Sequence, residues 1–407
     1  MPRILFITRR PRTYYKMSND FYTYFPSTYS GDIIFSLPKP KRKSGKKMLE
    51  YYKNAYIGNF KCHIFVKPNL PKVISNFIEF IYFLYKAIRL HYSEKFDIIV
   101  AYSPLKTGFI AWIVSKLIKR KFIVEVNGVF DKALLLDSFK ITWQTRLKYI
   151  ISKCIIRFVL KKADHIKLIF KDQVKSFNLN NIDKKSTCFA VFVPISNLKF
   201  KKEEIEPYIL FLGFPWYLKG VDILIKAFNL ISNEFHEYRL KIVGFCPDKS
   251  YFQTLAKGND KIELCNSVPY DEAMKLMSRC TLFVLPSRTE AMGKVLLEAM
   301  ASKKPIIASN VDGIPYYIKH GFNGLLFESE NVEDLAEKIR IILSNPDYAK
   351  KLAENGYNYV HQHLSEERYV ECYKKMIERV LSSERKVKNH GYSYSKRTNK
   401  RKCFYTL

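Results

Sequence analysis

Two glutamates, Glu290 and Glu298, are the residues of this 407-residue chain whose types and spacing point most directly to chemistry. They lie eight positions apart in the stretch PSRTEAMGKVLLEAMASKKP, residues 286–305. The apolar run TLFVLP before it predicts a buried strand, and VLLEAMASKK predicts a helix with one apolar face. Gly293 lies where that helix would begin, so one glutamate precedes the turn and the other lies inside the helix.

The start of this helix is predicted to attract an anion. The backbone N–H groups of residues 293–295 would have no partner inside the helix, and the helix dipole is positive at that end. Lys294 adds a positive charge. Glu298 could accept hydrogen bonds from two hydroxyl groups of a ribose, and Glu290 could reach a sugar at the other end of the same ligand. The plainer alternative is that Glu290 is a solvated loop residue and that Glu298 pairs with Lys294.

A second turn of the same kind occurs in ILFLGFPWYLKGVDILIKAF, residues 209–228. A strand would end at Gly213, and Lys219 with Gly220 would open the next helix. Taken alone, Lys219 could be a surface lysine at a helix start. Two strand–loop–helix turns, each with a glycine and a lysine, are less expected by chance and together predict one diphosphate site.

The hydrophobic pattern predicts the strands and helices that would position these turns. The strands are continuous apolar runs, which is typical of parallel strands buried on both faces. We expect strands at residues 3–8, 32–37, 62–66, 97–102, 121–126, 165–170, 187–193, 208–213, 239–245, 261–265, 281–286, 305–310 and 324–328. We expect helices near residues 72–92, 105–119, 140–162, 172–177, 219–233, 270–279, 294–303 and 314–319, and further helices to about residue 382.

This order predicts an α/β protein with two domains. Residues 1–200 and 201–370 would each form a Rossmann-like, doubly wound parallel sheet, and residues 371–407 a C-terminal helix with a basic tail. The charged segment KFKKEEIEP, residues 199–207, is predicted to be a linker. Because parallel sheets bind ligands at the carboxyl ends of their strands, the active site is expected in a cleft between the two domains.

The net charge of +31 belongs mainly to the first domain. Lys and Arg exceed Asp and Glu by 25 in residues 1–200, whereas residues 201–350 are close to neutral. The densest basic clusters are residues 9–12, 39–47 and 385–402. A basic half of this size indicates an anionic partner rather than a solvated face. A membrane surface is favoured over nucleic acid, because no base-reading or aromatic-interleaved motif accompanies the charge.

The eight cysteines are scattered without C-x-x-C spacing, which predicts reduced thiols and neither disulfides nor a zinc site. The N-terminus lacks the pattern of a signal peptide. No apolar run reaches the ~18 residues that span a bilayer. The closest run, residues 73–90, is interrupted by charges and predicts a helix that is buried or lies on a surface.

Residues 208–328 resemble the retaining GT-B glycosyltransferases of family four, the group 1 type. Three pieces match in order: the strand–glycine–loop–Lys–Gly–helix turn at 208–228, then PSRTEAMGKVLLEAMASKKPIIAS, then VDGIPYYIKHGFNGLLFE. KKADHIKLIF and VPISN match the first half more weakly. The resemblance implies a GT-B fold, a nucleotide-diphosphate sugar bound by the second domain and an acceptor bound by the first. It implies no cofactor and no metal, because fixed positive groups would replace the ion in a chain without Asp-X-Asp.

The same resemblance assigns roles to single residues. Glu298 would bind ribose hydroxyls, Glu290 would contact the donor sugar near its anomeric centre, and Lys219 would neutralise the diphosphate leaving group. That leaving group would act as the base in a transfer that retains the anomeric configuration. The donor would also be lined by Gly213 and by the backbone of Met292, Gly293, Lys294 and Val295. The acceptor side would include Arg9, Arg10, Asn127 and Gly128.

Several positions depart from the family pattern. Phe214 stands where an arginine is frequent, and Ala291-Met292 replaces the usual Gly-Phe. Tyr316 replaces an acid, the first loop TRRPR lacks glycines, and Asn127-Gly128 stands where a histidine is frequent. Arg9, Arg10 or Arg288 could supply the missing diphosphate contact.

We therefore expect a hexosyltransferase of polysaccharide or glycolipid biosynthesis that acts on a membrane-associated or lipid-linked glycan. It would be cytoplasmic and peripheral on the inner face of the cell membrane. One alternative is a catalytically silent relative that binds a nucleotide sugar or a partner, with Phe214 and Tyr316 as its best evidence. The other is a nucleic-acid binder, which the chain lacks the motifs to support.

Overall fold

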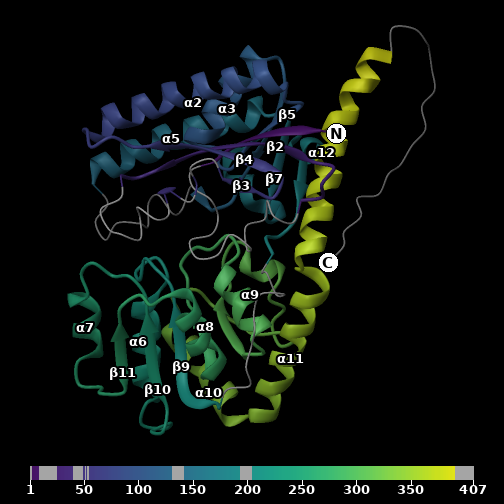
Figure 1. The fold of residues 1–407 in the computed structure, drawn as a ribbon. Coiled ribbons are helices and arrows are strands. Elements are labelled where there is room, and N and C mark those ends of the chain that lie inside the picture. The colour runs from purple at the N-terminus through teal and green to yellow at the C-terminus, as the bar shows by residue number, and fades with distance from the viewer. Residues whose placement is uncertain are drawn as a thin grey trace.

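The computed structural model describes residues 2–8, 25–39, 49–50, 52, 55–130, 142–192 and 204–389, with side chains to residue 382. Two sheets of mainly parallel strands organise these residues, one built by each half of the chain (Figure 1). Several predicted features lie outside the described residues: Arg9, Arg10, the VPISN turn, most of the cluster at 39–47 and most of the basic tail.

The first sheet has eight strands in the order β3-β4-β2-β1-β5-β6-β7-β8. All neighbours are parallel except β3 and β4. The strands are β1 (Arg3–Ile7), β2 (Ser30–Leu37), β3 (Tyr56–Ile57), β4 (Phe60–Val66), β5 (Ile98–Ala101), β6 (Lys121–Glu125), β7 (His165–Leu168) and β8 (Ser186–Cys188). The order runs outward from β1 in both directions, as in a doubly wound sheet.

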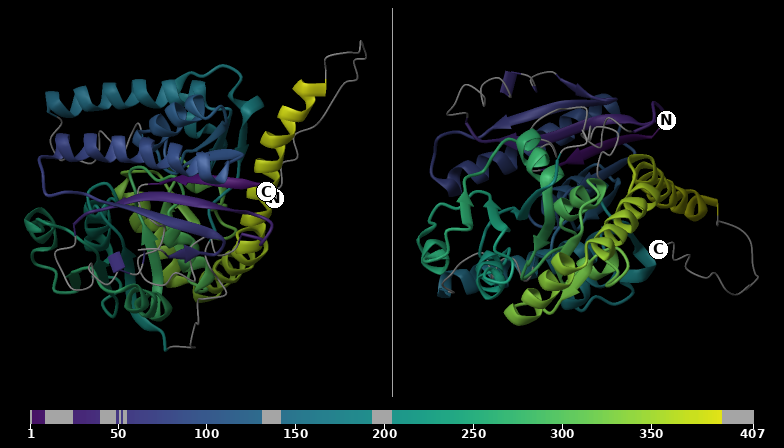
Figure 2. Two further views of the ribbon diagram at one scale, coloured as in Figure 1. Left: turned by 45° about the horizontal axis from the view of Figure 1, so that its top comes forward. Right: turned by 90° about the horizontal axis from the view of Figure 1, so that it is seen from below.

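Helices cover both faces of this sheet, which explains why its strands are apolar on both sides. Helices α2 (Lys72–Glu94), α3 (Lys106–Leu117) and α5 (Trp143–Lys162) pack on one face (Figure 2). The opposite face is covered in part by α12 (Glu366–Asn389), the last helix, which runs along the side of the molecule from the second half to the first (Figure 1). Its Tyr369, Tyr373 and Met376 share a buried cluster with Ile4 and Phe6 of β1.

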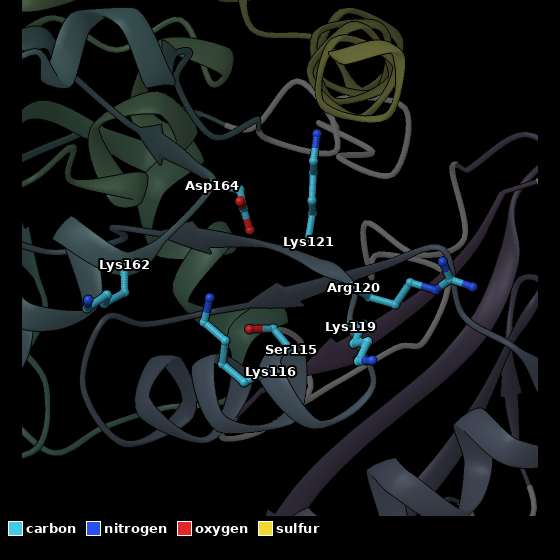
Figure 3. A pocket seen from close by; sticks show the side chains of 7 residues that line it. All are labelled: Ser115, Lys116, Lys119, Arg120, Lys121, Lys162 and Asp164. Carbon is cyan, nitrogen blue, oxygen red and sulfur yellow. The ribbon is translucent and has the colours of Figure 1, made fainter. Parts of the chain in front are cut away.

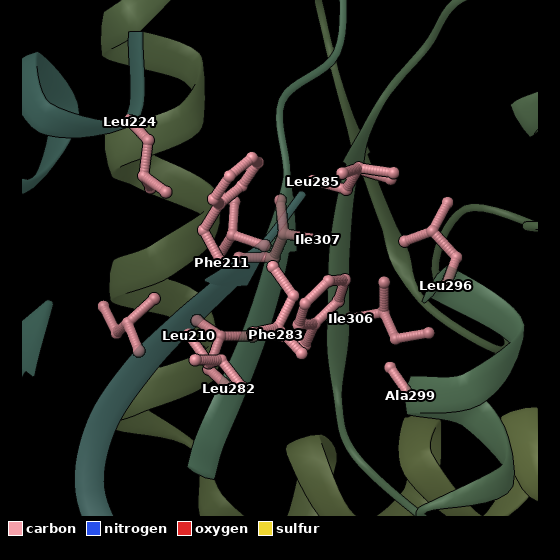
Figure 4. Packing of buried hydrophobic residues seen from close by; sticks show 14 of the residues in the cluster. Leu210, Phe211, Leu224, Leu282, Phe283, Leu285, Leu296, Ala299, Ile306 and Ile307 are labelled. Atoms are coloured by element: carbon pink, nitrogen blue, oxygen red, sulfur yellow. The ribbon is translucent and has the colours of Figure 1, made fainter. Parts of the chain in front are cut away.

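The second sheet has six parallel strands in the order β11-β10-β9-β12-β13-β14. They are β9 (Glu206–Leu212), β10 (Arg239–Val243), β11 (Ile262–Cys265), β12 (Cys280–Leu285), β13 (Ile306–Ser309) and β14 (Leu325–Phe327). The helices are α6 (Val221–Ile231), α7 (Ser250–Ala256), α8 (Tyr270–Arg279), α9 (Lys294–Ala301), α10 (Val332–Ser344) and α11 (Pro346–His363). Its core packs Phe211, Phe283 and Ile307 of three neighbouring strands against Leu224 and Leu296 of the helices (Figure 4).

Most predicted elements are confirmed, and the differences are local. The strand predicted at 187–193 is only β8, and the predicted helices at 172–177 and 314–319 are 3₁₀ turns, η3 (Lys171–Phe177) and η6 (Ile314–Tyr316). The short elements β3, α7 and η4 (Ile182–Lys185) were not predicted. The end of the predicted linker joins β9, which begins at Glu206. The domain boundaries stay a prediction, and residues of the predicted C-terminal segment lie in the core of the first sheet.

The order of the second sheet reverses between β9 and β12, so the loops after these strands meet at one edge. They are the two turns predicted to bind a diphosphate, residues 213–220 and 286–293. Gly220 is the point of contact: its φ is +68°, and a Cβ there would lie 1.9 Å from the carbonyl oxygen of Pro286. Only glycine allows both this backbone conformation and this approach.

We expect Gly220→Ala to lower the free energy of unfolding by more than about 2 kcal/mol, because left-handed backbone costs an L-residue about 1–2 kcal/mol and Pro286 must also move. Gly258 offers a matched control, since its φ is +87° and nothing lies within 4 Å of an added Cβ. Gly258→Ala should therefore show the backbone cost alone. Urea unfolding of both variants measures the difference, and equal losses would show that the two loops do not depend on this contact.

Candidate active site

The side chains of Lys219 and Glu290 form an ion pair where the two loops meet. Lys219 ends the loop after β9, and Glu290 lies in the loop after β12, 71 positions further along the chain. Both side chains are mostly buried. The sequence predicted that Lys219 faces the diphosphate and that Glu290 faces the donor sugar. The side chains of these two residues are in direct contact.

The backbone around Glu290 is held by the loop after β13. One carboxylate oxygen of Asp312 accepts from the Thr289 hydroxyl at 2.6 Å and from the Glu290 N–H at 3.2 Å. The N–H of Gly313 donates to the Glu290 carbonyl at 3.1 Å. These bonds fix the position from which the Glu290 side chain reaches Lys219.

Arg288 ties the two loops together a second time. Its guanidinium donates two parallel hydrogen bonds to Asp222 of α6, at 2.8 and 2.7 Å, and the pair is almost completely buried. The guanidinium also donates to the Tyr217 carbonyl and to Glu330, and the backbone N–H of Arg288 donates to the Leu218 carbonyl at 3.0 Å. Burial alone would lower the pKa of Arg288, but the hydrogen bonds and charge of Asp222 outweigh it and raise that pKa. The suggestion that Arg288 replaces the missing diphosphate contact is not supported, because its guanidinium is committed to these partners.

The buried pair Arg288–Asp222 should couple strongly in a double-mutant cycle. Arg288→Met or Asp222→Leu alone should lower the free energy of unfolding by about 3–5 kcal/mol, because each leaves the other charge buried without its partner. The double variant should lose much less than the sum. The exposed pair Arg340–Glu234, with the same bidentate geometry at 2.7 Å, is the control and should show far weaker coupling. Urea unfolding of the wild type and the six variants measures both couplings, and additive losses at Arg288 and Asp222 would refute the clamp.

Glu298 lies inside α9 with 8 % of its surface exposed. The hydroxyl of Tyr270, at the start of α8, donates to it at 3.1 Å. Lys294 is exposed, and between these two described residues no ion pair forms, so the alternative that Glu298 pairs with Lys294 is wrong. Burial raises the pKa of Glu298, while the charge of Lys294 and the Tyr270 hydroxyl act against that shift. A buried carboxylate with one donor has room for further donors, which ribose hydroxyls would supply.

Gly293 opens α9 with φ +67°, and the helix begins at Lys294 as predicted. The N–H groups of Gly293, Lys294 and Val295 precede the hydrogen-bonded turns of the helix. Met292 is buried, and its sulfur accepts from the N–H of Val191 in the first half at 3.1 Å. Gly213 follows β9, and its N–H donates to the Val243 carbonyl at 3.1 Å. The predicted donor-binding residues thus lie in the two loops that carry Lys219 and Glu290 and in α9, which follows the second loop.

Contacts between the halves place the carboxyl end of the first sheet against these loops. The hydroxyl of Tyr316 donates to Asp172 at 2.7 Å, and its ring lies 5.3 Å from that of Phe170, just after β7. A Cβ at Gly313 would come within 2.8 Å of the Phe170 ring. Tyr316, which departs from the family pattern, therefore serves a contact between the two halves. Phe214, the other departure, is 64 % exposed.

Asn127 and Gly128 follow β6 at the carboxyl end of the first sheet. The Asn127 side chain donates to the Tyr102 carbonyl at 3.0 Å and to Glu125 at 2.9 Å, and it accepts from Lys167 at 3.3 Å. Tyr373 of α12 donates to the other oxygen of Glu125 at 2.6 Å. The predicted site residues did not include Glu125, Lys167 or Tyr373. Two of them could have been noticed as charged residues inside apolar strands.

Two further features bear on ligands. Among the described residues, no cluster of three or more His, Cys, Asp or Glu could hold a metal ion. A basic hollow of about 330 Å³ lies at the amino ends of β6 and β7, the edge opposite to the loops above. Its lysines, among them Lys116, Lys119 and Lys162, point in different directions (Figure 3), so they do not converge on one ligand.

The family model "Glycosyl transferases group 1" matches residues 195–359, which hold the second sheet and both turns. This part of the chain therefore matches the family that its sequence resembles. An uncharacterised glycosyltransferase of Methanocaldococcus jannaschii is 26% identical over 344 residues, which cover 83% of this chain and 82% of the relative. The protein is thus a glycosyltransferase whose sugar donor is a nucleotide sugar.

A solved structure shows the fold, and a further relative is similar in sequence. HepE of Anabaena, solved in complex with UDP-glucose, superposes with a TM-score of 0.66 at 15% identity, covering 93% of this chain and 99% of HepE. The fold is GT-B, as the sequence predicted. The N,N'-diacetylbacillosaminyl-diphospho-undecaprenol alpha-1,3-N-acetylgalactosaminyltransferase of Campylobacter jejuni is 24% identical over 266 residues, 56% of this chain and 66% of that enzyme.

Proposed function

We propose that this glycosyltransferase moves a hexosyl group from a nucleotide-diphosphate sugar to a membrane-associated or lipid-linked glycan, with retention of configuration and without a metal ion. The observation that carries the proposal is the Lys219–Glu290 ion pair beside the amino end of α9. In the proposed complex the cation would face the diphosphate and the carboxylate would face the sugar.

The donor would lie along α9. The N–H groups of Gly293, Lys294 and Val295 would face the diphosphate, because the amino end of a helix combines unpaired donors with a positive dipole. Glu298, one turn further, would accept from the ribose hydroxyls beside Tyr270. Both carboxylates then have donors to accept from, which offsets the cost of placing them near a phosphate.

The reaction would break the bond between the anomeric carbon and the diphosphate oxygen, and the bonding electrons would leave with the diphosphate. Lys219 would neutralise the charge that develops on this leaving group. The acceptor hydroxyl would attack from the face that the leaving group vacates and transfer its proton to the departing phosphate. Glu290 would hold the sugar so that its anomeric carbon stays beside Lys219.

The acceptor proposal rests on charge and on a relative. The excess of 25 basic residues lies in residues 1–200, the domain that we propose for the acceptor, with residues 201–370 binding the donor. The Campylobacter enzyme acts on a diphospho-undecaprenol glycan by its name. An anionic leaflet, such as the inner face of the cell membrane, would attract this half and present such an acceptor. Helix α12 would link the two domains, because it follows the second domain in the sequence and packs on the sheet of the first domain.

A catalytically silent relative is less well supported. The departure at Tyr316 has a partner in Asp172 and requires no loss of activity. Lys219, Glu290 and Glu298 are all present and are brought to one edge of the sheet.

Nucleotide binding should depend on Glu298 and on pH. Glu298→Ala should weaken the binding of the preferred nucleoside diphosphate by about 2–4 kcal/mol, because two hydrogen bonds to a charged group are lost and partly replaced by water. Ribose hydroxyls favour the ionised carboxylate, so binding lowers a pKa that burial has raised. Affinity should therefore rise as the pH increases through the pKa of the free protein and then level off.

Calorimetric titration with UDP, GDP and ADP at several pH values measures this. Glu298→Gln should bind the nucleotide weakly. Its affinity should also depend less on pH than that of the wild type, because the variant has no carboxyl group to ionise at this position. Glu333→Gln, an exposed substitution on α10, is the control and should match the wild type. A Glu298→Gln variant that binds with wild-type affinity would remove the assigned ribose contact.

Turnover should depend on the ion pair. Lys219→Met and Glu290→Gln should each lower kcat by about 10²–10³, because each removes a charged group placed at the reacting centre. Lys226→Met, an exposed lysine on α6, should leave kcat unchanged. Release of nucleoside diphosphate from the preferred donor, measured with membrane extract as the acceptor, gives the rates. Normal turnover in both site variants would disprove the assignment.

A further inference from the structure

We propose that the outer face of helices α2 and α5 docks flat on the surface of an anionic lipid bilayer. This docking face is defined by Val73, Phe77 and Ile81 of α2 and by Trp143, Leu147 and Ile150 of α5. It deepens the proposed function, because it specifies how the chain would reach a membrane-bound acceptor, but it stands on separate observations.

The exposed stripe on α2 points directly away from the sheet. The buried residues of the helix are Ser75, Glu79, Phe83 and Ala87, spaced four apart. The apolar residues Val73, Phe77 and Ile81 fall two positions earlier, about 200° around the helix, and are 81%, 64% and 48% exposed. Single exposed apolar residues are ordinary, but a continuous apolar stripe facing water marks an interaction site.

Helix α5 repeats the arrangement. Trp143, Leu147 and Ile150 are 72%, 48% and 56% exposed, whereas the residues buried against the sheet are Ile156, Val159 and Leu160. Both helices pack on the same side of the sheet (Figure 2), so the faces of α2 and α5 that are turned away from the sheet lie on one side of the molecule. Two apolar stripes on one side of the molecule form a surface rather than a line.

Helix α3 lies between α2 and α5 and joins them through aromatic rings. Phe80 of α2 stacks on Phe109 of α3 at 6.5 Å, and Trp112 of α3 meets Phe158 of α5 edge-on at 4.7 Å. The three helices therefore form one layer with a fixed outer surface. A preformed face loses little conformational freedom when it binds.

The positive charge of this layer of three helices favours an anionic partner. Helices α2, α3 and α5 hold three, two and six Lys or Arg residues, against Glu79 and Glu94 alone. Glu79 is buried and paired with Lys67 and Lys106 at 2.9 and 2.6 Å, so it adds no negative charge to the surface. Basic residues beside exposed apolar and aromatic side chains are typical of helices that lie in the interface of an anionic bilayer.

Other partners fit the face less well. A second copy of the chain would bring two strongly basic surfaces together, which opposes association. Nucleic acid would match the charge but not the aliphatic stripes, because phosphates and base edges call for cations and polar groups. None of the helices that the structure describes has the length and hydropathy of a transmembrane segment.

The docking face also lies near the edge of the first sheet that is predicted to bind the acceptor. Helices α2 and α5 begin near the carboxyl edge of the first sheet, because in this fold a helix runs back antiparallel to the strands. Asn127 and the contacts between the halves lie at that same edge. A protein resting on this face would hold its acceptor edge beside the bilayer.

Vesicle sedimentation of the full chain tests the proposal. The wild type should bind phosphatidylcholine vesicles that contain phosphatidylglycerol, and bind pure phosphatidylcholine vesicles far less. Phe77→Gln with Leu147→Gln should weaken binding to the anionic vesicles at least about tenfold, because two apolar side chains no longer enter the interface while the net charge stays the same. Phe245→Gln with Phe322→Gln is the matched control, since these phenylalanines are 58% and 54% exposed in the second half, and should bind as the wild type does.

A second readout tests insertion rather than attraction. Brominated lipids should quench the tryptophan fluorescence of the wild type, and Trp143→Phe should remove most of that quenching, because Trp216 is buried and Trp112 lies between helices. Unchanged unfolding curves for all variants show that the exposed substitutions leave the fold intact.

The outcomes separate the proposals. Vesicle binding that survives Phe77→Gln with Leu147→Gln would overturn the docking face in favour of charge alone. A dimer in solution that these substitutions dissociate, or RNA binding without vesicle binding, would overturn it in favour of the other partners. Nucleotide binding needs no membrane, so loss of one activity with retention of the other shows which proposal has failed.

Discussion

The contact between two loops at the edge of the second sheet is the constraint on which the rest of the site depends. The chain must bring residues 213–220 and 286–293 close enough for Lys219 to reach Glu290. Gly220 permits the approach, because any larger residue would meet Pro286, and the buried Arg288–Asp222 pair holds it. A parallel sheet whose order reverses between β9 and β12 is the architecture that places both loops at one point.

Buried charges at the carboxyl ends of both sheets cost free energy unless partners satisfy them. In the second sheet Glu298 has Tyr270, and burial still raises its pKa, so the carboxyl group gains from any ligand that brings hydroxyl donors. In the first sheet Glu125 is satisfied by Asn127 and by Tyr373 of α12. The last helix therefore does more than cover a face, because it completes a polar network beside the predicted acceptor residues.

The two halves of the chain differ in what they offer to a partner. The second half is nearly neutral and brings Lys219 and Glu290 into contact at one edge of its sheet, as the proposed site for a small anionic ligand requires. The first half is strongly basic and leaves apolar side chains exposed on α2 and α5, as a large and flat partner requires. The family indicates a nucleotide sugar as the donor. The exposed surface of the first half supports the proposal that the transfer takes place at a membrane.

The sequence by itself determined most strands and helices, the two turns and the candidates Glu290, Lys219 and Glu298, because apolar runs and glycine–lysine turns are local signals. It also led to the family through those turns. Only the tertiary structure decided that Lys219 pairs with Glu290, that Glu298 takes its hydrogen bond from Tyr270 rather than from Lys294, and that Arg288 belongs to Asp222, since these contacts join residues from separate elements. Only the tertiary structure decided which face of α2 is exposed. That helix is apolar on both of its faces, and only packing against the sheet determines which face is buried and which remains on the surface.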